Sequence, residues 1–432
     1  MRALPLTPPS RGAPPSSRLP RGLAPLGIRD FLLFWIGFAT SNAGRWVELT
    51  GALWLVYELA QSPVLLGLLG AARAVPTIIL SPLAGVIADR VDQRHLLIAT
   101  QGLALIVSLA VGTLVVVGDV ELWHIYLAVA IQAAITAFDA AGRQALFPRL
   151  IPRSSLPEAV TLSITAARLA KLVGPVIGGF AIAALGIASP FFLNALSFVV
   201  LMVALVMIRA LAALPPRQRH SFFADLREGM LHIIRTPVVS GLFKLEIAFA
   251  LFEMNPVMIA IVGREILGVG PEAMGLLLAA PATGSFIGIA WLIFAGHAQR
   301  QGRFNVLCTL AYAFALVLFA ATQVFAAALM ALALIGILDA LVTVTRSSVT
   351  QLVAPGRMRG RIMANMGMVT RGISPLAETQ SGILAAALGP PVAIVAAAGA
   401  LAVASVTTAW LNRPLWSFSR ADDLRASSEQ DR

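Results

Sequence analysis

The chain has 432 residues, of which 58% are hydrophobic and 12% are charged, and its mean hydropathy is +0.84. Soluble domains carry about 25% charged residues, so this composition argues against a soluble enzyme, a disordered chain or a nucleic-acid-binding domain, despite the net charge of +11. A bilayer span takes about 20 apolar residues, and the length allows about a dozen of them. The sequence therefore predicts an all-α integral membrane protein whose main partner is the lipid bilayer.

The first segment, residues 1–29, is rich in proline, serine and arginine and has no apolar core of the signal-peptide kind. We expect it to be a disordered cytoplasmic tail. Cys308 is the single cysteine, which excludes an internal disulfide and argues against a thiolate metal cluster.

Apolar stretches of spanning length then follow one another along the chain. Six come before a charged segment at 210–236, near residues 30–58, 63–88, 95–117, 121–147, 157–184 and 187–209. Six come after it, near residues 238–262, 272–296, 304–322, 325–347, 361–388 and 391–412. In the charged segment, Leu226, Met230 and Ile233 recur at helical spacing, which indicates an amphipathic helix on the membrane surface that tethers the two sets.

The chain thus divides into five predicted units. They are a tail (1–29), a six-helix bundle (30–209), a linker (210–236), a second six-helix bundle (237–413) and a second tail (414–432).

Basic residues set the expected orientation. With the N-terminus inside, the outer loops hold one basic residue, Arg264, while the arginine clusters such as Arg90 with Arg94 and the last arginines of the chain lie inside. Cytoplasmic loops of membrane proteins carry the excess of Lys and Arg. We therefore expect both termini in the cytoplasm, and the composition, rich in Ala and Arg but poor in Lys, is typical of a bacterial inner-membrane protein.

The two halves also share spaced residues. Arg143, Pro152 and Arg168 in the first half match Arg346, Pro355 and Arg371 in the second, each 203 residues later. Parallel repeats of this kind are the architecture of one large class of transporters, related by a pseudo-twofold axis along the membrane normal.

Charged residues occur inside the predicted spans. Because a charge at the bilayer centre is costly, such residues face a cavity or a partner. They are Arg45, Glu48, Arg73, Asp139, Arg143, Arg168, Lys171, Lys244, Glu246, Glu253, Asp339, Arg371 and Glu378. Their distribution over some spans and not others predicts a polar transport pathway.

Each of these charges has a second interpretation. Arg45 and Glu48 are three residues apart and can neutralise each other or handle substrate and protons, and Arg371 shares a helix face with Glu378. Asp139 is four residues before Arg143, a spacing that favours a gate or a scaffold.

Three carboxylates are the candidate proton carriers, because a carboxyl group in an apolar cavity can take up and release a proton near neutral pH. They are Glu246, Glu253 and Glu378. Together with Arg45, Glu48, Arg168 and Arg371 they form the expected cavity and proton-coupling set.

Other chemistry is missing from the sequence. A nucleotide-binding P-loop needs Gly-Lys-Ser/Thr, but Lys171 follows Ala170 and Lys244 follows Phe243. The five histidines lie in loops or at span ends, and no His, Asp or Glu cluster has metal-ligand spacing. We expect no enzyme activity, no cofactor and no metal, so an ion gradient would have to drive active transport.

The segment after the second span, Gly85 to Leu97, reads GVIADRVDQRHLL. It resembles motif A of the major facilitator superfamily, although Asp92 replaces the usual Gly and Gln93 a basic residue. The resemblance implies that Gly85 allows close helix approach and that Asp89 meets a helix N-terminus. It also implies that Arg90 and Arg94 pair with an acid such as Asp139, and that this cluster, with Arg143, gates a fold of two six-helix bundles.

In the fifth span, Gly174, Pro175, Gly178 and Gly179 form the run GPVIGG. This run is similar to motif C of the exporting, proton-antiport branches of that superfamily, and it also suits plain helix packing. The stretches at 54–63, 142–148 and 359–363 look like the bacterial subgroup that contains siderophore and macrolide exporters. One departure is the fourth span, where Ile125 to Ala137 holds Gln132 but lacks the arginine that assists proton coupling in many relatives.

These resemblances predict a monomeric exporter of a small amphipathic organic molecule (a drug, siderophore or other metabolite) that works by proton antiport and alternating access. Two other functions remain open. One is an importer or facilitator of a small metabolite, and the other is a non-transporting sensor or scaffold that retains the fold.

Overall fold

The computed structural model of the protein describes residues 20–88, 90–208, 222–296, 298–356 and 358–419. Within these ranges every regular element is a helix, as the sequence predicts. The N-terminal half contains η1 (Arg21–Gly27), α1 (Arg29–Ala60), α2 (Pro63–Ala88), α3 (Gln93–Val117), α4 (Leu122–Leu150), η2 (Arg153–Ser155), α5 (Leu156–Leu185) and α6 (Ser189–Met207). The C-terminal half, preceded by α7 (Phe222–Arg235), contains α8 (Pro237–Phe252), α9 (Pro256–Glu265), α10 (Pro271–Ala295), α11 (Gln301–Ala320), α12 (Phe325–Val353), α13 (Arg359–Leu388), α14 (Pro390–Leu411) and α15 (Arg413–Ser417).

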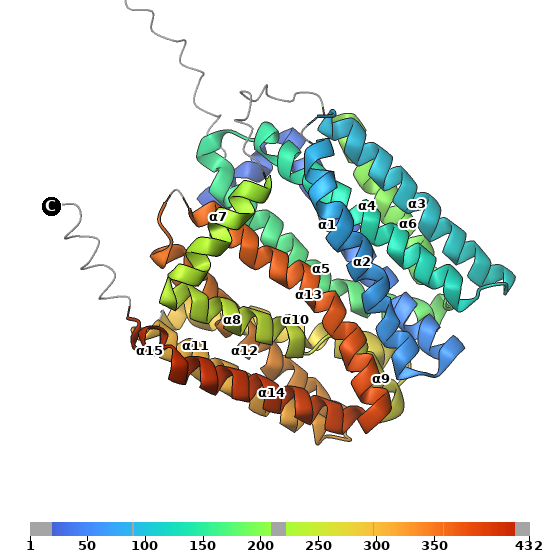
Figure 1. The fold of residues 1–432 in the computed structure, drawn as a ribbon. Helices are drawn as coiled ribbons and strands as arrows, with labels where there is room; N and C mark the ends of the chain where they lie inside the picture. Colours follow the sequence, from blue (N-terminus) through green and yellow to red (C-terminus); the bar gives the residue numbers. More distant parts are fainter. Residues whose placement is uncertain (1–19, 89, 209–221, 297, 357, 420–432) are drawn as a thin grey trace, which may run out of the picture.

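The long helices run back and forth between two ends of the molecule (Figure 1). We call the end that holds η1, α7 and α15 the terminal end. The opposite end, which we call the hairpin end, holds the connections at 61–62, 118–121, 186–188, 266–270, 321–324 and 389. Because the described chain starts and finishes at the same end, the number of passes is even.

Most helix packing stays within one half. In the N-terminal half α1 packs on α5 and α6, and α2 and α3 pack on α4. In the C-terminal half α12 packs on α10 and α11, and α14 on α11 and α8. Most of the contact between the halves comes from two helix pairs, α2 with α13 and α5 with α10, and α9 adds smaller contacts with α1 and α2.

The apolar core is continuous at the hairpin end and divided at the terminal end. The largest cluster contains Leu53 and Leu69 from the N-terminal half together with Val257 and Leu277 from the C-terminal half. At the terminal end, Phe31, Leu97 and Leu201 belong to a cluster built from the N-terminal half alone. Leu242, Val306 and Leu415 belong to another cluster, built from the C-terminal half. The halves therefore share a core at one end and keep separate cores at the other.

The predicted spans agree with the helix bounds to within a few residues, with one exception. The seventh span is broken into α8 and α9 at Glu253–Asn255, where Asn255 caps the second helix and Pro256 opens it. Ten helices, counting α8 and α9 together, are long and apolar enough to cross a bilayer in the described residues. The other two long helices, α1 and α13, hold charged residues in their middle.

The tails differ from the expectation. Residues 1–19 and 420–432 lie outside the described ranges, but the last part of the expected N-terminal tail forms η1, which packs against α1 and α5. In the expected C-terminal tail, Leu415 of α15 is fully buried. The tether at 210–236 contains the predicted amphipathic helix, α7, which packs on α13 and α8.

Candidate functional site between the two halves

Glycines bring α2 and α13 into backbone contact near the hairpin end. A Cβ atom on Gly70 would lie 2.1 Å from the carbonyl oxygen of Pro375, and one on Gly67 would lie 2.9 Å from the Cα of Gly382. Real side chains cannot occupy such positions, so these glycines permit the contact between the halves.

The GPVIGG run makes close contacts of the same kind from α5. A Cβ on Gly179 would lie 2.4 Å from the carbonyl oxygen of Pro271 in α10, across the boundary between the halves. Gly174 and Gly178 instead face α1, where a Cβ would lie 2.4 Å from the Cβ of Trp46 and 3.0 Å from that of Thr50. In this state the run packs α5 against a helix of each half.

Arg264 of α9 closes the hairpin end with polar contacts. Its guanidinium lies 3.8 Å from Glu58 and 4.1 Å from the ring centre of Trp54, both in α1. Tyr57 of α1 donates a hydrogen bond of 3.4 Å to Glu265. The sequence assigned Arg264 only to the orientation of the chain, and its role between the halves was missed.

Arg73 of α2 forms an ion pair with Glu378 of α13, which crosses between the halves. Glu378 is buried, at 7% exposed. Arg371 was expected to share a face with Glu378, but its exposed side chain makes no ion pair with it. Sequence distance hides the actual partner, because Arg73 and Glu378 are 305 positions apart.

A second charge cluster lies inside the N-terminal half. Asp139 is fully buried, forms ion pairs of 2.6 Å with Arg45 of α1 and with Arg143 of α4, and accepts a hydrogen bond of 2.9 Å from Gln101. The expected pairing of Arg45 with Glu48 is therefore wrong, because Arg45 forms its ion pair with Asp139 of α4.

Glu48 is held separately by neutral groups. Ser108 donates a hydrogen bond of 2.5 Å to its carboxylate, and the Asn194 amide donates another. These contacts join α1 to α3 and α6, which indicates a structural role within the N-terminal half.

In the C-terminal half, Glu246 of α8 forms an ion pair of 2.5 Å with Arg346 of α12 and accepts a hydrogen bond of 2.7 Å from Thr370 of α13. Arg346 is 4% exposed, and its guanidinium lies 5.3 Å from the ring centre of Phe249. The sequence repeat pointed to Arg346 through its match with Arg143, yet Arg346 was not chosen as a site residue. Both arginines bind a buried carboxylate.

Glu253 stands at the break between α8 and α9. Its carboxylate accepts a hydrogen bond of 3.0 Å from Ser374 of α13, and it has no ion pair among the described residues. Asp339, Lys171 and Arg346 are the charged groups that interact with it through space. Of the three candidate proton carriers, Glu253 is the one whose partner is neutral.

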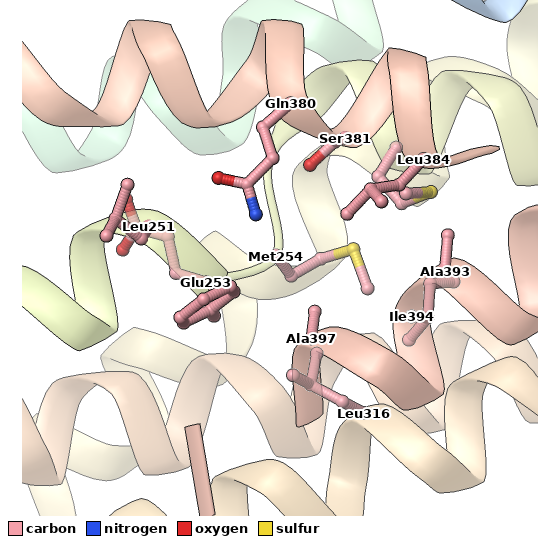
Figure 2. Close-up of a pocket in the computed structure, with 12 residues that line it drawn as sticks. Leu251, Glu253, Met254, Leu316, Gln380, Ser381, Leu384, Ala393, Ile394 and Ala397 are labelled. Carbon is pink, nitrogen blue, oxygen red and sulfur yellow. The ribbon is translucent and has the colours of Figure 1, made fainter. Parts of the chain in front are cut away.

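A cavity of about 20 Å³ adjoins this break and is lined by Glu253, Met254, Gln380 and Ser381 among others (Figure 2). Figure 2 shows Gln380 reaching from α13 toward the broken segment. A cavity of this size holds about one water molecule, so the break has room for a buried water beside Glu253.

Four cations inside the predicted spans have no carboxylate at ion-pair distance among the described residues, and they are Arg168, Lys171, Lys244 and Arg371. Arg168 is half-buried, while Lys171 and Arg371 are exposed. The ammonium group of Lys171 lies 5.3 Å from the ring centre of Trp46.

The motif A segment gives a partial picture, because Asp89 lies outside the described residues. Arg94 donates to the carbonyl oxygen of Val206 at 2.6 Å, so the expected pairing of Arg94 with Asp139 is wrong in this state. Arg90 is exposed and does not pair with Asp139 either. Gly85 has no atom within 4 Å of a Cβ position, so close helix approach is absent there.

Asp92, which stands where motif A usually has Gly, caps the N-terminus of α3. The backbone amide of His95 donates to its carboxylate at 3.0 Å and lowers the pKa of that carboxyl below its ordinary value. The departure from the motif thus has a local structural role.

The chain matches the family model described as "Transmembrane secretion effector" over residues 21–430. Among curated proteins, it is 26% identical over 253 residues to the uncharacterized MFS-type transporter YfiS of Bacillus subtilis, a match covering 57% of this chain and 60% of that protein. It is 26% identical over 282 residues to the enterobactin exporter EntS of Shigella boydii, covering 64% of this chain and 66% of that protein. The chain thus aligns with less than two thirds of the length of these relatives.

Solved structures of transporters share the fold. The POT family transporter PepTSo superposes with a TM-score of 0.71 at 12% identity, covering 90% of this chain and 98% of that one. The bacterial homolog of the human lysosomal transporter Spinster, in an inward-facing and occupied conformation, gives a TM-score of 0.69 at 13% identity, covering 91% and 97%. These likenesses confirm the all-α major facilitator fold.

Proposed function

The chain belongs to the Transmembrane secretion effector family of major facilitator transporters, and on that premise we propose that it exports a small amphipathic organic molecule in exchange for protons. It is a multi-pass membrane transporter. The export direction, the proton and the cargo belong to the proposal.

The division of the apolar core carries this proposal. The halves share one core at the hairpin end and have separate cores at the terminal end. The arginine-rich connections lie at the terminal end, so the positive-inside rule assigns that end to the cytoplasm. A transporter in this state is closed to the outside, and in this proposal it is the state in which the exporter loads cargo from the cytoplasm. The GPVIGG run and the distant relative named as an enterobactin exporter favour the same direction.

In this proposal the two six-helix bundles, 30–209 and 237–413, rock as bodies about the contacts of α2 with α13 and α5 with α10. Residues 210–236 tether them. All twelve passes, including α1 and α13, cross the membrane, because Arg45, Glu48 and Glu378 are held by polar partners on neighbouring helices rather than facing lipid.

Glu253 is the proton carrier in this account. Glu246 and Glu378 each form an ion pair with an arginine. Glu253 is held by a hydroxyl group at a helix break with a water-sized cavity beside it. Discontinuous helices are common at the coupling sites of transporters. Protonation of Glu253 changes its hydrogen bond with Ser374 of α13, the helix that contacts α2 of the other half, and that change couples the proton to the motion of the halves.

The test is the accumulation of a fluorescent amphipathic dye in efflux-deficient bacteria that express the chain, with and without a protonophore. We expect accumulation to fall, the protonophore to abolish the effect and Glu253→Gln to weaken it. The control, Glu48→Gln, removes a half-buried carboxylate of α1 that contacts α3 and α6, and it should keep proton dependence. Raised accumulation would indicate an importer, and unchanged accumulation with confirmed membrane insertion would reject broad efflux.

A further inference from the structure

Arg168 and Lys171 lie on the side of α5 that faces the space between the halves. Pro175 and Gly179 of α5 contact α10, and Gly174 contacts α1. Arg168 and Lys171 precede Pro175 by seven and four residues, so they continue this stripe toward the terminal end. The position of Lys171 over the Trp46 ring of α1 agrees with that direction.

Arg371 occupies the corresponding side of α13. Pro375 and Glu378 contact α2, and Ser374 binds Glu253 of α8. Arg371 lies three residues before Ser374 and four before Pro375. Around the helix axis it therefore points between the directions of these two residues. Its side chain is exposed, and its guanidinium lies 3.1 Å from the Cβ position of Gly367, one turn toward the terminal end.

The repeat fixes the relative depth of the two arginines. Arg168 and Arg371 are 203 residues apart, and so are Gly179 and Gly382, which contact the first residue of α10 and of α2 in the other half. Each arginine precedes its glycine by 11 residues, which is about 16.5 Å along a helix toward the terminal end. They therefore stand at a similar depth on opposite halves.

The neighbouring arginines already have counter-charges. Arg73 is paired with Glu378, Arg346 with Glu246, and Arg45 with Asp139. Arg168 and Arg371 have no such partner among the described residues. A cation at this depth is costly unless water or an anion compensates it, and a guanidinium matches the geometry of paired oxyanion oxygens.

We propose that the cargo is an amphipathic organic anion whose oxyanion group is bound between Arg168 and Arg371. Ile164, one turn from Arg168 and 53% exposed, and the Trp46 ring offer the apolar part of the surface. The inference rests on the proposed transport function and names its substrate class. When the halves rock to the other state, the anion keeps its contact with only one of the two arginines, and this weaker binding releases it.

The electrostatic part can be tested without knowing the cargo. In the full-length, detergent-purified chain with Cys308→Ser, a cysteine is introduced by Ile164→Cys. It is modified with sulfonatoethyl or trimethylammonioethyl methanethiosulfonate. Relative to free cysteine, we expect the anionic reagent to gain about fivefold over the cationic one. Arg168→Gln and Arg371→Gln should each reduce this preference, whereas Arg371→Lys should keep it and guards against misfolding. Val324→Cys at the hairpin end is the matched control and should respond to neither. A preference for the cationic reagent, or indifference to Arg371→Gln, would overturn the proposal.

The substrate class is tested by binding of carboxyfluorescein, an anion, and rhodamine 123, a cation with a related ring system, to the same purified chain. We expect carboxyfluorescein to bind about tenfold more tightly, with the difference lost in Arg168→Gln and in Arg371→Gln. Tighter or equal binding of rhodamine 123 contradicts the anion site. The same dyes in proteoliposomes with an imposed pH gradient separate the two proposals. If the anion binds but the pH gradient does not move it, proton antiport is rejected and the anion site stands. If the gradient moves the cation and the anion is not preferred, the anion site is rejected and proton antiport stands.

Discussion

Arg73 and Glu378 form the ion pair that links α2 of one half to α13 of the other. Glu378 lies beside the glycine contact, because a Cβ on Gly70 would be 2.7 Å from its Cβ, and Arg73 follows Gly70 by one turn toward the terminal end. The pair therefore lies at the level where the backbones of the two halves touch. Any rocking of the halves has to break or pivot this pair.

Glu378→Gln is expected to destabilise the hairpin-closed state. The substitution leaves Arg73 without its charge partner, and removing one member of a buried pair costs about 3 kcal/mol. The exchange Arg73→Glu with Glu378→Arg should recover much of the loss, because it restores the attraction. Thermal unfolding of the single and exchanged variants in detergent measures this. Additive losses in the exchanged variant would show that the pair contributes no coupling energy.

Gly70→Leu is expected to wedge the halves apart at the hairpin end, because even a Cβ there would meet the Pro375 carbonyl oxygen. Cysteines placed at Leu69 and Val257, which are buried in the core that the halves share, report the opening through their accessibility to a water-soluble maleimide. The matched control is Gly85→Ala, whose Cβ meets no atom within 4 Å and should leave accessibility and thermal stability unchanged. Equal behaviour of the two variants would contradict the role assigned to Gly70.

Arg264→Gln is expected to loosen the same end by removing the cation that contacts Glu58 and the Trp54 ring. The pair is half exposed, and such contacts contribute about 1 kcal/mol or less. The expected effect is thus a modest rise in hairpin-end accessibility with normal expression. Arg264→Lys keeps the charge and should behave nearly as the parent chain, and a Lys variant as open as the Gln variant would reject the electrostatic explanation.

Gly229→Ala is expected to lift α7 from α13, because the new Cβ would lie 2.4 Å from the Asn365 amide nitrogen. Limited proteolysis between the halves should become faster, since α7 is the described part of the tether. Gly360→Ala, which has open space around its Cβ position, is the control and should not change the cleavage rate. Cleavage at the parent rate in Gly229→Ala would mean that α7 is held by other contacts.

The sequence predicted the helices well because a membrane span is a local property of length and hydropathy. The break at Glu253–Asn255 was missed because both parts are apolar. The Asn255-Pro256 pair, a cap followed by a proline, was the available signal. The residues just before α1 were expected to be disordered because they are rich in proline, serine and arginine. They form η1 instead, and composition alone does not show that this element packs on α5.

Pairing partners were predicted much less well, because they depend on which helices meet. Glu48 was the nearest acid to Arg45 in sequence, but packing of α1 on α4 presents Asp139 instead. Glu378 was assigned to Arg371 on its own helix, although the α2–α13 contact gives it Arg73. Long-range ion pairs need the tertiary arrangement, which neither spacing nor hydropathy encodes. The proton and gating roles assigned to these residues stay predictions.

The most direct test of alternating access is a pair of distances measured by spin-label spectroscopy between the halves. One pair, Val117 with Val324, spans the hairpin end, and the other, Val91 with Leu352, spans the terminal end. We predict two populations at each pair that exchange in opposite senses as pH changes, the hairpin-end distance lengthening when the terminal-end distance shortens. In Glu253→Gln the populations should no longer respond to pH. A single distance at both ends that pH does not alter, or distances that lengthen together, would contradict an exporter that works by proton-coupled rocking of its halves.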